Sequence, residues 1–447
     1  MSIQQKVAAF LGYYGFDAGG ISVNGLIDSL LYDMEKGLSE DAPARRNSMS
    51  AALDMIPTWA APPSSPPKNT SVIVIDAGGT NFRACLVSFD GEGRPEISAL
   101  QKFPMPATDT ELSRKDFFEA MAAKLSHVKN KSARIGFCFS YAMKITPDGD
   151  GEVTAFSKEI KAPEVIGARV GEGLAEALSA QGWKKPERIA LLNDTAAALL
   201  AGAATASGGK SYDSFVGLIL GTGLNSAYIE SEPIPKIQGG AASGIPVNQI
   251  VVCESGKFDK LPRSFFDREV DKHTTAPGTY ILEKMCSGGY IGRVATCALK
   301  RAATDGLFSE KTAASFTNAE ITLKDMDQFL YFPKRTDTVL GKILANGTGE
   351  DAETVYTILD AFVDRAARLA AGLICAAVIK SGRGKNPASP VCVVCEGTTF
   401  EKTHNLKPRV LAYVNEALAR ERRVYCDIIG LENAITLGAA IAGATDL

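Results

Sequence analysis

The sequence predicts an α/β protein with two similar halves, and two observations lead to this expectation. Candidate strands and candidate helices alternate along most of the 447 residues, as they do in α/β folds. Two stretches, 71–88 and 214–230, also share one design: an apolar run, a turn with glycine, and a second apolar run. The chain therefore contains two strand hairpins of one kind, far apart in sequence.

The first hairpin has the residues of a phosphate-binding turn. Its first apolar run ends at Asp76, where a carboxylate can hold a hydrated cation. Gly78 and Gly79 allow a positive φ and a close approach of a ligand to the backbone, and successive N–H groups in such a turn can bind an anion. Side chains that can donate to phosphate oxygens follow: Thr80, Asn81 and Arg83. For this stretch alone, a plain β-hairpin with a glycine turn is the alternative.

A second hairpin of the same kind makes the interpretation of the first one more specific. It has a Gly-Thr-Gly turn around Thr222, and Asn225 follows in the second apolar run. Two phosphate-type hairpins in one chain indicate two similar domain cores that face each other, which is how the actin-like ATPase fold is built. We therefore expect two actin-like, ribonuclease H-like domains around a deep cleft.

Composition and charge exclude several other classes of protein. The chain is 45% hydrophobic and 22% charged, which is ordinary for a globular protein. Its net charge of −3 gives no basic excess for binding nucleic acid. No apolar stretch has the length of a membrane span, and the N-terminus does not read as a signal peptide. We expect a cytoplasmic protein without nucleic-acid or membrane partners, as a monomer or homodimer.

The cysteines and histidines do not predict a metal site. The nine cysteines are scattered and lie mostly in apolar runs, as in a reduced protein. Cys392 and Cys395 form a C-x-x-C within a predicted strand, where residues three apart point to opposite faces, so core packing is preferred over chelation. The three histidines are isolated in sequence, and a structural role is preferred for each of them.

The remaining elements follow in order, and they divide the chain. Residues 1–56 have helical spacing, and 57–68 contain five prolines, which predicts a stiff linker. The polar stretch 141–161, with its Asp and Gly clusters, is predicted to be a mobile loop. Further strands are expected at 134–140, 188–192, 249–253, 391–396 and 424–429, and further helices at 115–126, 163–180, 194–204, 279–303, 352–381, 405–422 and 432–444.

Polar residues recur where predicted strands end. Asp76, Ser140 and the pair Asn193-Asp194 follow three such strands, and Asn225 and Glu254 belong to the second half. In open α/β sheets ligands bind outside the carboxyl ends of the strands, so this distribution is typical of a single binding site. Taken singly, Asn193, Asp194 and Thr195 are also good helix N-caps.

These residues belong to motifs that together resemble a hexokinase of the glucokinase type. The resemblance extends from about residue 25 to the C-terminus and keeps the order and spacing of the motifs. The matching segments are DAGGTNFR (76–83), GFCFS (136–140), SK (157–158), LNDT (192–195), GLILGTGLN (217–225), VVCES (251–255), LPRSFFDREVD to SGGYIG (261–292) and CEGT (395–398).

The resemblance implies a role for each matched position. Asp194 resembles the base that takes the proton from the sugar 6-hydroxyl, and Lys158 resembles a lysine that holds the sugar and the transferring phosphoryl. Positions that match sugar-binding residues are Ser140, Ser157, Lys158, Asn193, Asp194, Asn225, Glu254 and Glu283. Positions that match the nucleotide side are Asp76, Gly78, Gly79, Thr80, Asn81, Arg83, Thr222, Gly397 and Thr398.

The chemistry of these residues agrees with a polyol ligand. A carboxylate can accept from two neighbouring hydroxyls at once, whereas an asparagine offers both a donor and an acceptor. Taken singly, Glu254 and Glu283 read as solvated surface charges, and within this set of residues that interpretation is set aside. No metal ligand is expected from the protein itself, because Mg²⁺ comes with ATP and prefers phosphate and water oxygens; Asp76 is expected to reach it through water.

The chain departs from the family pattern at a few positions. Residues 139–143 read FSYAM where a proline and a cysteine are common after the aromatic residue, and Ser157 replaces the usual threonine. After Glu254 the chain reads SGKFD rather than Trp-Gly-Ala-Phe-Gly, and Cys395-Glu396 and Thr398 replace the usual residues of the adenosine site. None of these changes removes a catalytic group, but they leave the preferred sugar open.

The sequence as a whole predicts an ATP-dependent kinase that makes hexose 6-phosphate from a hexose, with D-glucose as the expected substrate, in the first step of glycolysis. By resemblance, a small domain holds residues 69–193 with 432–447, and a large domain holds 194–431 with the N-terminal helices of 1–56 packed on it. Two alternatives are kept: a kinase of another hexose or polyol on this fold, and a non-catalytic sugar-sensing homologue.

Overall fold

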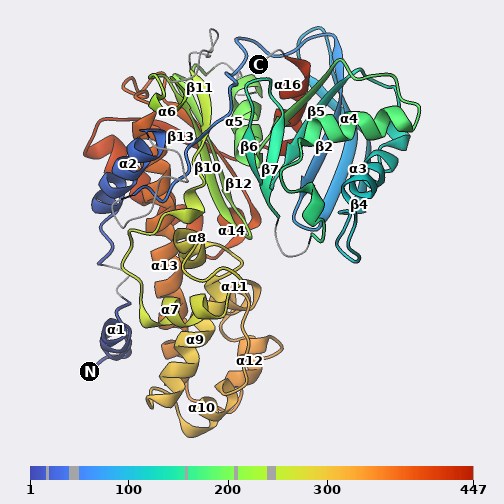
Figure 1. The fold of residues 1–447 in the computed structure, drawn as a ribbon. Helices are drawn as coiled ribbons and strands as arrows, with labels where there is room; N and C mark the ends of the chain where they lie inside the picture. The colour runs from blue at the N-terminus through green and yellow to red at the C-terminus, as the bar shows by residue number, and fades with distance from the viewer. Residues whose placement is uncertain (17–19, 40–49, 157–159, 206–209, 239–247, 446–447) are drawn as a thin grey trace.

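The computed structural model describes most of the chain in two lobes (Figure 1). The predicted site residues Ser157 and Lys158 lie outside the described residues. The described residues are 1–16, 20–39, 50–156, 160–205, 210–238 and 248–445.

One lobe contains a five-stranded sheet with the order β4-β3-β2-β5-β8. The first three strands along the chain are antiparallel neighbours, and β5 and β8 run parallel to β2. The strands are β2 (Thr70–Gly78), β3 (Asn81–Phe89), β4 (Pro95–Pro104), β5 (Arg134–Phe139) and β8 (Arg188–Leu192).

The other lobe repeats this topology. Its sheet has the order β1-β11-β10-β9-β12-β13. Without the edge strand β1, it again has three antiparallel strands in meander order, followed by two strands parallel to the first. The prediction of two similar cores is confirmed. The strands are β1 (Ile56–Pro57), β9 (Ser214–Leu220), β10 (Leu224–Glu230), β11 (Gln249–Val252), β12 (Val391–Glu396) and β13 (Cys426–Ile429).

The central strands β2 and β5 of the five-stranded sheet are buried on both faces because they are apolar on both sides. Ile73 and Ile75 of β2 pack with the side chains of α3 (Arg114–Ala123) and α4 (Val170–Ala180). Val72 and Val74 point the other way, into a cluster with the central helices α5 (Asp194–Thr205) and α16 (Ala434–Ala444). This alternation follows from the two-residue period of a strand.

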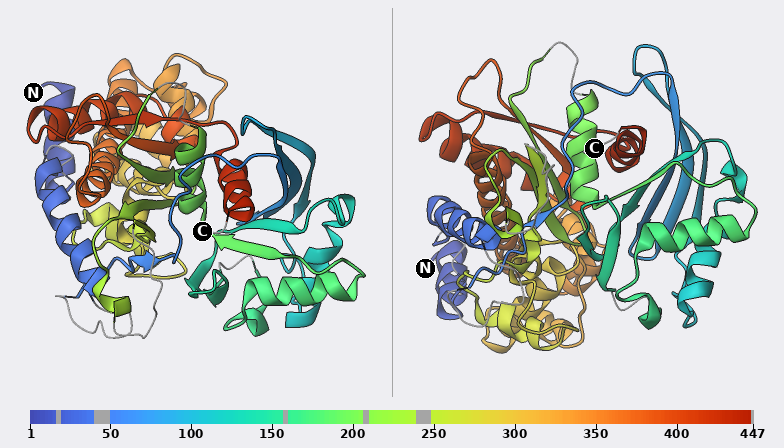
Figure 2. Two further views of the ribbon diagram at one scale, coloured as in Figure 1. Left: turned by 90° about the horizontal axis from the view of Figure 1, so that it is seen from above. Right: turned by 45° about the horizontal axis from the view of Figure 1, so that its top comes forward.

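Helices α5 and α16 lie side by side between the two sheets (Figure 2). Helix α16 packs on β2 and β5, while α5 packs on β9 and β10. Their contact requires glycine, because a Cβ on Gly438 would lie 1.8 Å from the carbonyl oxygen of Ala197. Each helix also needs a glycine in its own sheet, namely Gly136 against Ala439 and Gly217 against Thr195. These contacts hold the two helices and the two sheets at a fixed, close distance.

The long helix α13 (Gly349–Lys380) is the centre of the helical part of the larger lobe. Helices α1 (Ile3–Tyr13) and α2 (Val23–Ser39) pack against it. The other helices are α6 (Pro235–Gln238), α7 (Phe265–Lys272), α8 (Ile281–Cys286), α9 (Ile291–Thr304), α10 (Glu310–Phe316), α11 (Leu323–Tyr331), α12 (Val339–Leu344), α14 (Thr398–Lys402) and α15 (Leu406–Val414). Single 3₁₀ turns occur at η2 (Ser126–Val128), η3 (Pro163–Val165) and η4 (Ser255–Lys257), and η5 (Asn415–Arg420) is a short π-helix that follows α15.

The mobile loop predicted at 141–161 is wrong for its first part. Residues of this stretch form a two-stranded sheet, β6 (Ala142–Ile145) and β7 (Gly151–Ala155). Asp150 fixes its turn, because its carboxylate accepts from the backbone N–H groups of Gly171 at 2.7 Å and Glu172 at 3.1 Å in the first turn of α4. The Asp and Gly residues that suggested mobility therefore make a structured turn.

The proline-rich stretch 57–68 begins within the larger lobe. Ile56 and Pro57 pair with β11, and the N–H of Thr58 donates to the carbonyl of Ile250 at 3.0 Å. The predicted domain boundaries stay a prediction. Across the described ranges, no helix combines the length and the apolar character that a membrane span requires.

The glycine contact between the central helices gives a first testable prediction. Gly438→Val should lower the free energy of unfolding by about 2 kcal/mol or more, because the new side chain overlaps the carbonyl of Ala197. Gly12→Ala in α1 is the matched control, since a Cβ there meets no atom within 4 Å and alanine favours a helix. Equal denaturation midpoints for Gly438→Val and the parent protein would contradict the close contact.

Candidate active site

The carboxyl ends of β2, β5 and β8 bring three predicted site positions to one edge of the smaller sheet. Ala77 pairs with Phe139 across β2 and β5, and Cys138 pairs with Leu192 across β5 and β8. Asp76, Ser140 and Asn193 therefore leave neighbouring strands at the same edge. The N–H of Ser140 donates to the carbonyl of Ala77 at 2.9 Å, which ties the second of these positions to the first strand.

Asp194 is the first residue of α5, and Thr195 orients the turn around it. The N–H of Thr195 donates to Asn193 Oδ1 at 2.9 Å and to Asp194 Oδ1 at 2.8 Å. The hydroxyl of Thr195 also donates to Asn193 Oδ1 at 2.6 Å. The side-chain oxygen of Asn193 is thus a helix cap, as its residue type allowed. Thr195 is a buried residue of this turn that the sequence analysis named only as a candidate N-cap within LNDT.

Burial raises the pKa of Asp194 to about 7. The nearby negative charges of Glu254 and Asp76 contribute to this rise, and the backbone N–H of Thr195 opposes it. A carboxyl with a pKa near neutrality can accept a proton from a substrate hydroxyl and keep it through the reaction step, which is what a general base must do. The charges of Glu254 from the larger lobe and of Asp76 from the smaller sheet both act on Asp194, so carboxylates of both sheets share one site.

Asn225 and Glu254 form the part of the site that belongs to the larger sheet. Asn225 Nδ2 donates to Glu254 Oε1 at 3.0 Å, and Asn225 Oδ1 accepts from the N–H groups of Ser226 at 2.8 Å and Ser255 at 3.1 Å. Glu254 has a φ of 56°, a left-handed conformation that is costly for a residue with a side chain. Asn225 therefore holds a strained loop in place and aims the carboxylate of Glu254. Burial raises the pKa of Glu254 as well.

Glu283 of α8 joins the second hairpin turn to the same group of carboxylates. Its Oε2 accepts from the N–H of Leu224 at 3.0 Å. A Cβ on Gly223 would lie 2.8 Å from this oxygen, so the turn needs glycine for Glu283 to approach. Burial raises the pKa of Glu283, and the charge of Glu254 raises it further.

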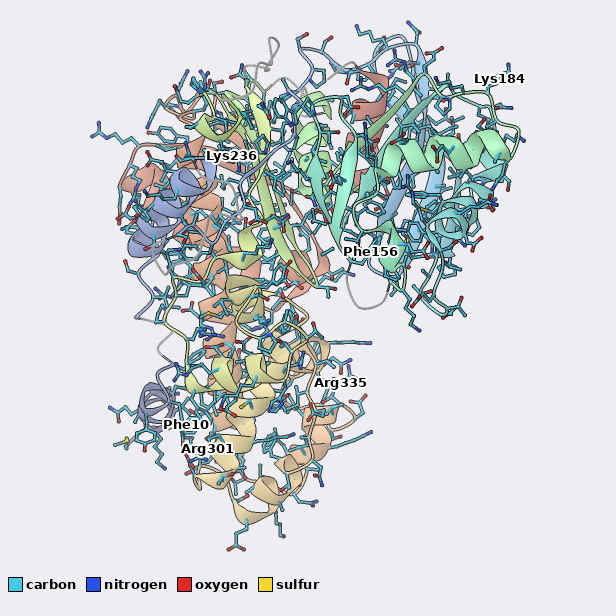
Figure 3. All side chains as sticks on the ribbon, viewed as in Figure 1. Phe10, Phe156, Lys184, Lys236, Arg301 and Arg335 are labelled. Carbon is cyan, nitrogen blue, oxygen red and sulfur yellow. The ribbon has the colours of Figure 1, made fainter. Side chains whose placement is uncertain are left out.

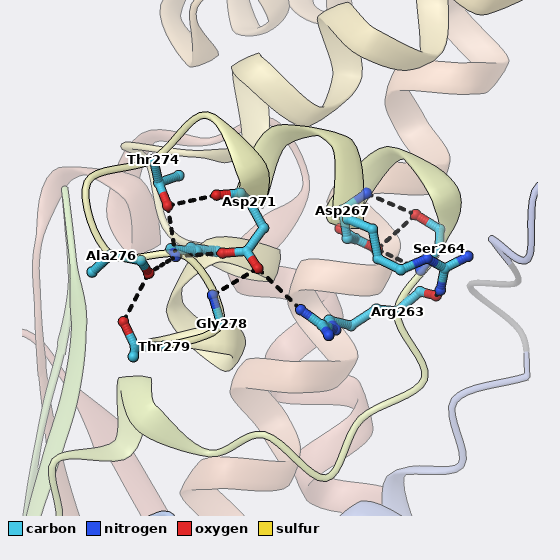
Figure 4. Close-up of polar contacts among 10 residues, drawn as sticks. Arg263, Ser264, Asp267, Asp271, Thr274, Ala276, Gly278 and Thr279 are labelled. Carbon is cyan, nitrogen blue, oxygen red and sulfur yellow. Dashed lines mark hydrogen bonds and ion pairs between the residues drawn. The ribbon is translucent and has the colours of Figure 1, made fainter.

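A buried ion pair next to Glu283 fixes the loop before α8 (Figure 4). Lys284 Nζ donates to Asp271 Oδ1 at 2.6 Å, to Thr274 Oγ1 at 2.9 Å and to the carbonyl of Ala276 at 2.7 Å. The other oxygen of Asp271 accepts from the N–H of Gly278 at 2.9 Å. The sequence analysis missed this support, although the lysine directly after Glu283 was a signal for it.

The first hairpin turn is tight, and its tip is exposed. Gly78 pairs with Asn81, Gly79 has a φ of 56°, and Thr80 is exposed. Arg83 Nη1 lies 3.3 Å from Asp76 Oδ2, so a cation and a carboxylate flank this turn. Tyr141, which the sequence analysis did not single out as a site residue, donates its hydroxyl to the carbonyl of Gly79 at 2.6 Å.

The second hairpin turn packs against the start of α14. Gly397 has a φ of 120°, and a Cβ there would lie 2.3 Å from the carbonyl oxygen of Leu220. The hydroxyl of Thr399 and the N–H of Gly288 both donate to the carbonyl of Gly221 at 2.8 Å. Thr222 and Thr398 lie at this junction and are exposed.

The residues present fit a magnesium ion that is held mainly by its nucleotide. Within the described ranges, no three His, Cys, Asp or Glu side chains come together in a way that could hold a metal ion. Asp76 offers a carboxylate beside the first hairpin turn, and burial raises its pKa whereas Arg83 lowers it. The hard oxygen of a single carboxylate beside phosphate-type turns is a donor that Mg²⁺ accepts through water.

The duplicated sheets and the two central helices define a two-domain protein with the actin-like ATPase fold. Two hexokinase family models match the chain, one over residues 215–445 and the other over residues 16–204. The chain belongs to the hexokinase family.

Relatives and solved structures agree with this assignment. The chain is 29% identical to Hexokinase-5 of Oryza sativa subsp. japonica over 391 residues, covering 82% of this chain and 74% of that protein. It is 29% identical to Hexokinase-like 1 protein of Arabidopsis thaliana over 453 residues, covering 93% and 86%. The fold matches a hexokinase from Schistosoma mansoni complexed with glucose with a TM-score of 0.78, over 99% of this chain and 98% of that one, at 23% identity.

The raised pKa of Asp194 predicts that this carboxyl destabilises the fold at neutral and higher pH. The pKa of Asp194 in the folded protein, about 7, lies above its ordinary value of 3.8. The folded state therefore loses stability relative to the unfolded state as the pH rises above 3.8, and this loss is complete once the pH exceeds the folded pKa. Asp194→Asn should therefore raise the free energy of unfolding by roughly 1–3 kcal/mol at alkaline pH and by little at acidic pH.

Asp351 supplies a control of opposite sign for this prediction. Hydrogen bonds from Ser309, Thr348 and Thr312 lower its pKa to about 2, against the opposing effect of burial. Asp351→Asn should destabilise the protein at alkaline pH. Thermal melts at both pH values check the pair, and a loss of stability in Asp194→Asn at alkaline pH would contradict the effect of burial on this carboxyl.

Proposed function

We propose that this protein phosphorylates a hexose at its 6-hydroxyl with ATP and Mg²⁺, giving hexose 6-phosphate and ADP, with D-glucose as the substrate. The observation that carries the proposal is the meeting of Asp194, Glu254 and Glu283 in one site, next to two phosphate-type hairpin turns. Carboxylates and amides suit a polyol, and glycine turns suit a nucleotide triphosphate. Such a reaction would supply the first phosphorylated sugar of glycolysis.

In the proposed reaction, Asp194 accepts the proton of the 6-hydroxyl while that oxygen attacks the terminal phosphoryl group of ATP. ADP leaves with the bond electrons, and the proton stays on Asp194 until it passes to solvent. Ser140, Asn193, Asn225, Glu254 and Glu283 orient the sugar, and Ser157 and Lys158, assigned by resemblance, complete the site. When bound, Mg²⁺ would supply positive charge at the phosphates, and Asp76 is the carboxylate that would hold it.

The nucleotide lies, in this proposal, between the two hairpin turns. The first turn supplies Gly78, Gly79 and Thr80, with Asn81 and Arg83 in the following strand. The second hairpin turn supplies Thr222, and the start of α14 beside it supplies Gly397 and Thr398. The solved hexokinase with glucose shares the whole fold, which supports a sugar site in this chain but leaves the choice of sugar to experiment.

A coupled assay of ADP release with glucose, mannose, fructose, glucosamine and a set of polyols tests the proposal. Turnover with glucose supports it. Turnover with another sugar or a polyol alone would identify the first alternative, a kinase of different specificity. Sugar binding without turnover would identify the second alternative, a sensor; the hexokinase-like relative makes this alternative worth testing.

Removal of the proposed base should separate chemistry from binding. Asp194→Ala is expected to lower kcat by ~10²–10⁴-fold, which is the usual worth of a positioned proton acceptor, and to leave glucose binding largely intact. In the parent enzyme, kcat/KM should fall as the pH falls below about 7, because Asp194 becomes protonated there. Near-parental turnover in Asp194→Ala would refute the assignment of the base.

The two glutamates should act on sugar binding. Glu254→Gln and Glu283→Gln are each expected to weaken glucose binding by roughly 1.5–3 kcal/mol, the value of a hydrogen bond to a charged group. Sugar-independent ATP hydrolysis should barely change, and it serves as the control for folding and nucleotide binding. Unchanged glucose affinity in both variants, measured by calorimetry, would place these carboxylates outside the pocket.

A further inference from the structure

Lys257 brings a half-buried positive charge to the loop that carries Glu254. It ends the single turn η4, and its N–H donates to the carbonyl of Glu254 at 3.0 Å. Its Nζ donates to Asp54 Oδ2 at 2.5 Å and lies 5.6 Å from the centre of the Tyr280 ring. The Lys257 side chain is only 28% exposed, so the ion pair with Asp54 is not a loose surface contact.

The backbone around Asp54 is held firmly in place. The N–H of the next residue, Met55, donates to the carbonyl of Cys253 at 3.3 Å, directly before Glu254. Lys236, labelled in Figure 3, donates to the carbonyl of Asp54 at 2.8 Å and to that of Gly37 at 2.9 Å. Asp54 is therefore a fixed negative charge next to the Glu254 loop, and it comes from a segment remote in sequence.

The two charges of this pair act on Glu254 in opposite directions. Burial raises the pKa of Glu254, the charge of Lys257 lowers it, and the charge of Asp54 raises it. Glu254 also interacts with titratable groups on other elements. Its charge raises the pKa of Asp194 on α5 and of Glu283 on α8. It also raises the pKa of Tyr280, which directly precedes α8. The hydrogen bond from Asn225 favours the charged form of Glu254.

We propose that Lys257 and Asp54 form a positioning pair that sets the pH range over which Glu254 can bind the sugar. This inference rests on the proposed function and adds a regulatory role to it. Ionised Glu254 can accept hydrogen bonds from two neighbouring hydroxyls, whereas the protonated group must also place a donor. Lys257 extends tight sugar binding to lower pH, and Asp54 limits that extension by neutralising part of the lysine charge.

The test measures glucose affinity by calorimetry from acidic to neutral pH, in an Asp194→Asn background. This background removes the titration of the proposed base, so that the binding curve reports the remaining carboxyls. Lys257→Met should move the acidic loss of affinity to higher pH and weaken binding at acidic pH by about threefold or more. Asp54→Asn should move it to lower pH, and Lys257→Arg should keep the parental curve.

Opposite shifts are what a purely structural ion pair would not give. If the pair only tethered the loop, removal of either partner would weaken binding in the same direction at every pH. Equal shifts in one direction, or no shift in either variant, would overturn the proposal. The same substitutions in a Glu254→Gln protein are the second control, because without a titrating Glu254 the opposite shifts should disappear.

Failure of this inference and failure of the proposed function can be told apart. If the parent protein binds glucose but the two variants do not shift in opposite directions, only the inference fails. If the parent protein binds none of the sugars tested, the proposed function fails and the sugar-binding role of the pair fails with it. A carbon-13 NMR titration of the Glu254 carboxyl then still shows whether Lys257 and Asp54 act on its charge.

Discussion

The close contact of α5 with α16 is the constraint on which the rest of the structure depends. These helices can approach only because Gly438 lies against the carbonyl of Ala197, and each helix meets its own sheet through a further glycine. Asp194 is the first residue of α5. The geometry of this helix contact therefore determines how far the Asp194 carboxyl lies from the strand ends of both lobes. The packing of the two helices thus positions a carboxylate of the site.

The site gathers negative charge that the fold does not neutralise completely. Burial raises the pKa values of Asp76, Asp194, Glu254 and Glu283 together, and several of these groups act on one another. Such an arrangement opposes folding and is retained where a ligand later satisfies the carboxylates. A polyol with several hydroxyl donors is a ligand of this kind, which links the electrostatics of these carboxyls to the proposed substrate.

The fold was largely predictable because its signals are local. The hairpins at 71–88 and 214–230 predicted the duplicated sheets. The apolar runs that end at Asp76, Ser140 and Asn193 predicted that these residues lie at strand ends. The structured turn at Asp150 was not predictable, because its partners in α4 come later in the chain. The Lys257–Asp54 pair was missed for the same reason, since two hundred residues separate its members.

The position of α16 has a consequence for the order in which the chain folds. The five-stranded sheet is complete in sequence at Leu192, but one of its faces is covered by α16, which begins only at Ala434. During synthesis from the N-terminus, the apolar face formed by Val72 and Val74 emerges long before the helix that buries it. The core of the larger lobe can form before this face is buried, so α16 completes a sheet whose strands were made long before it.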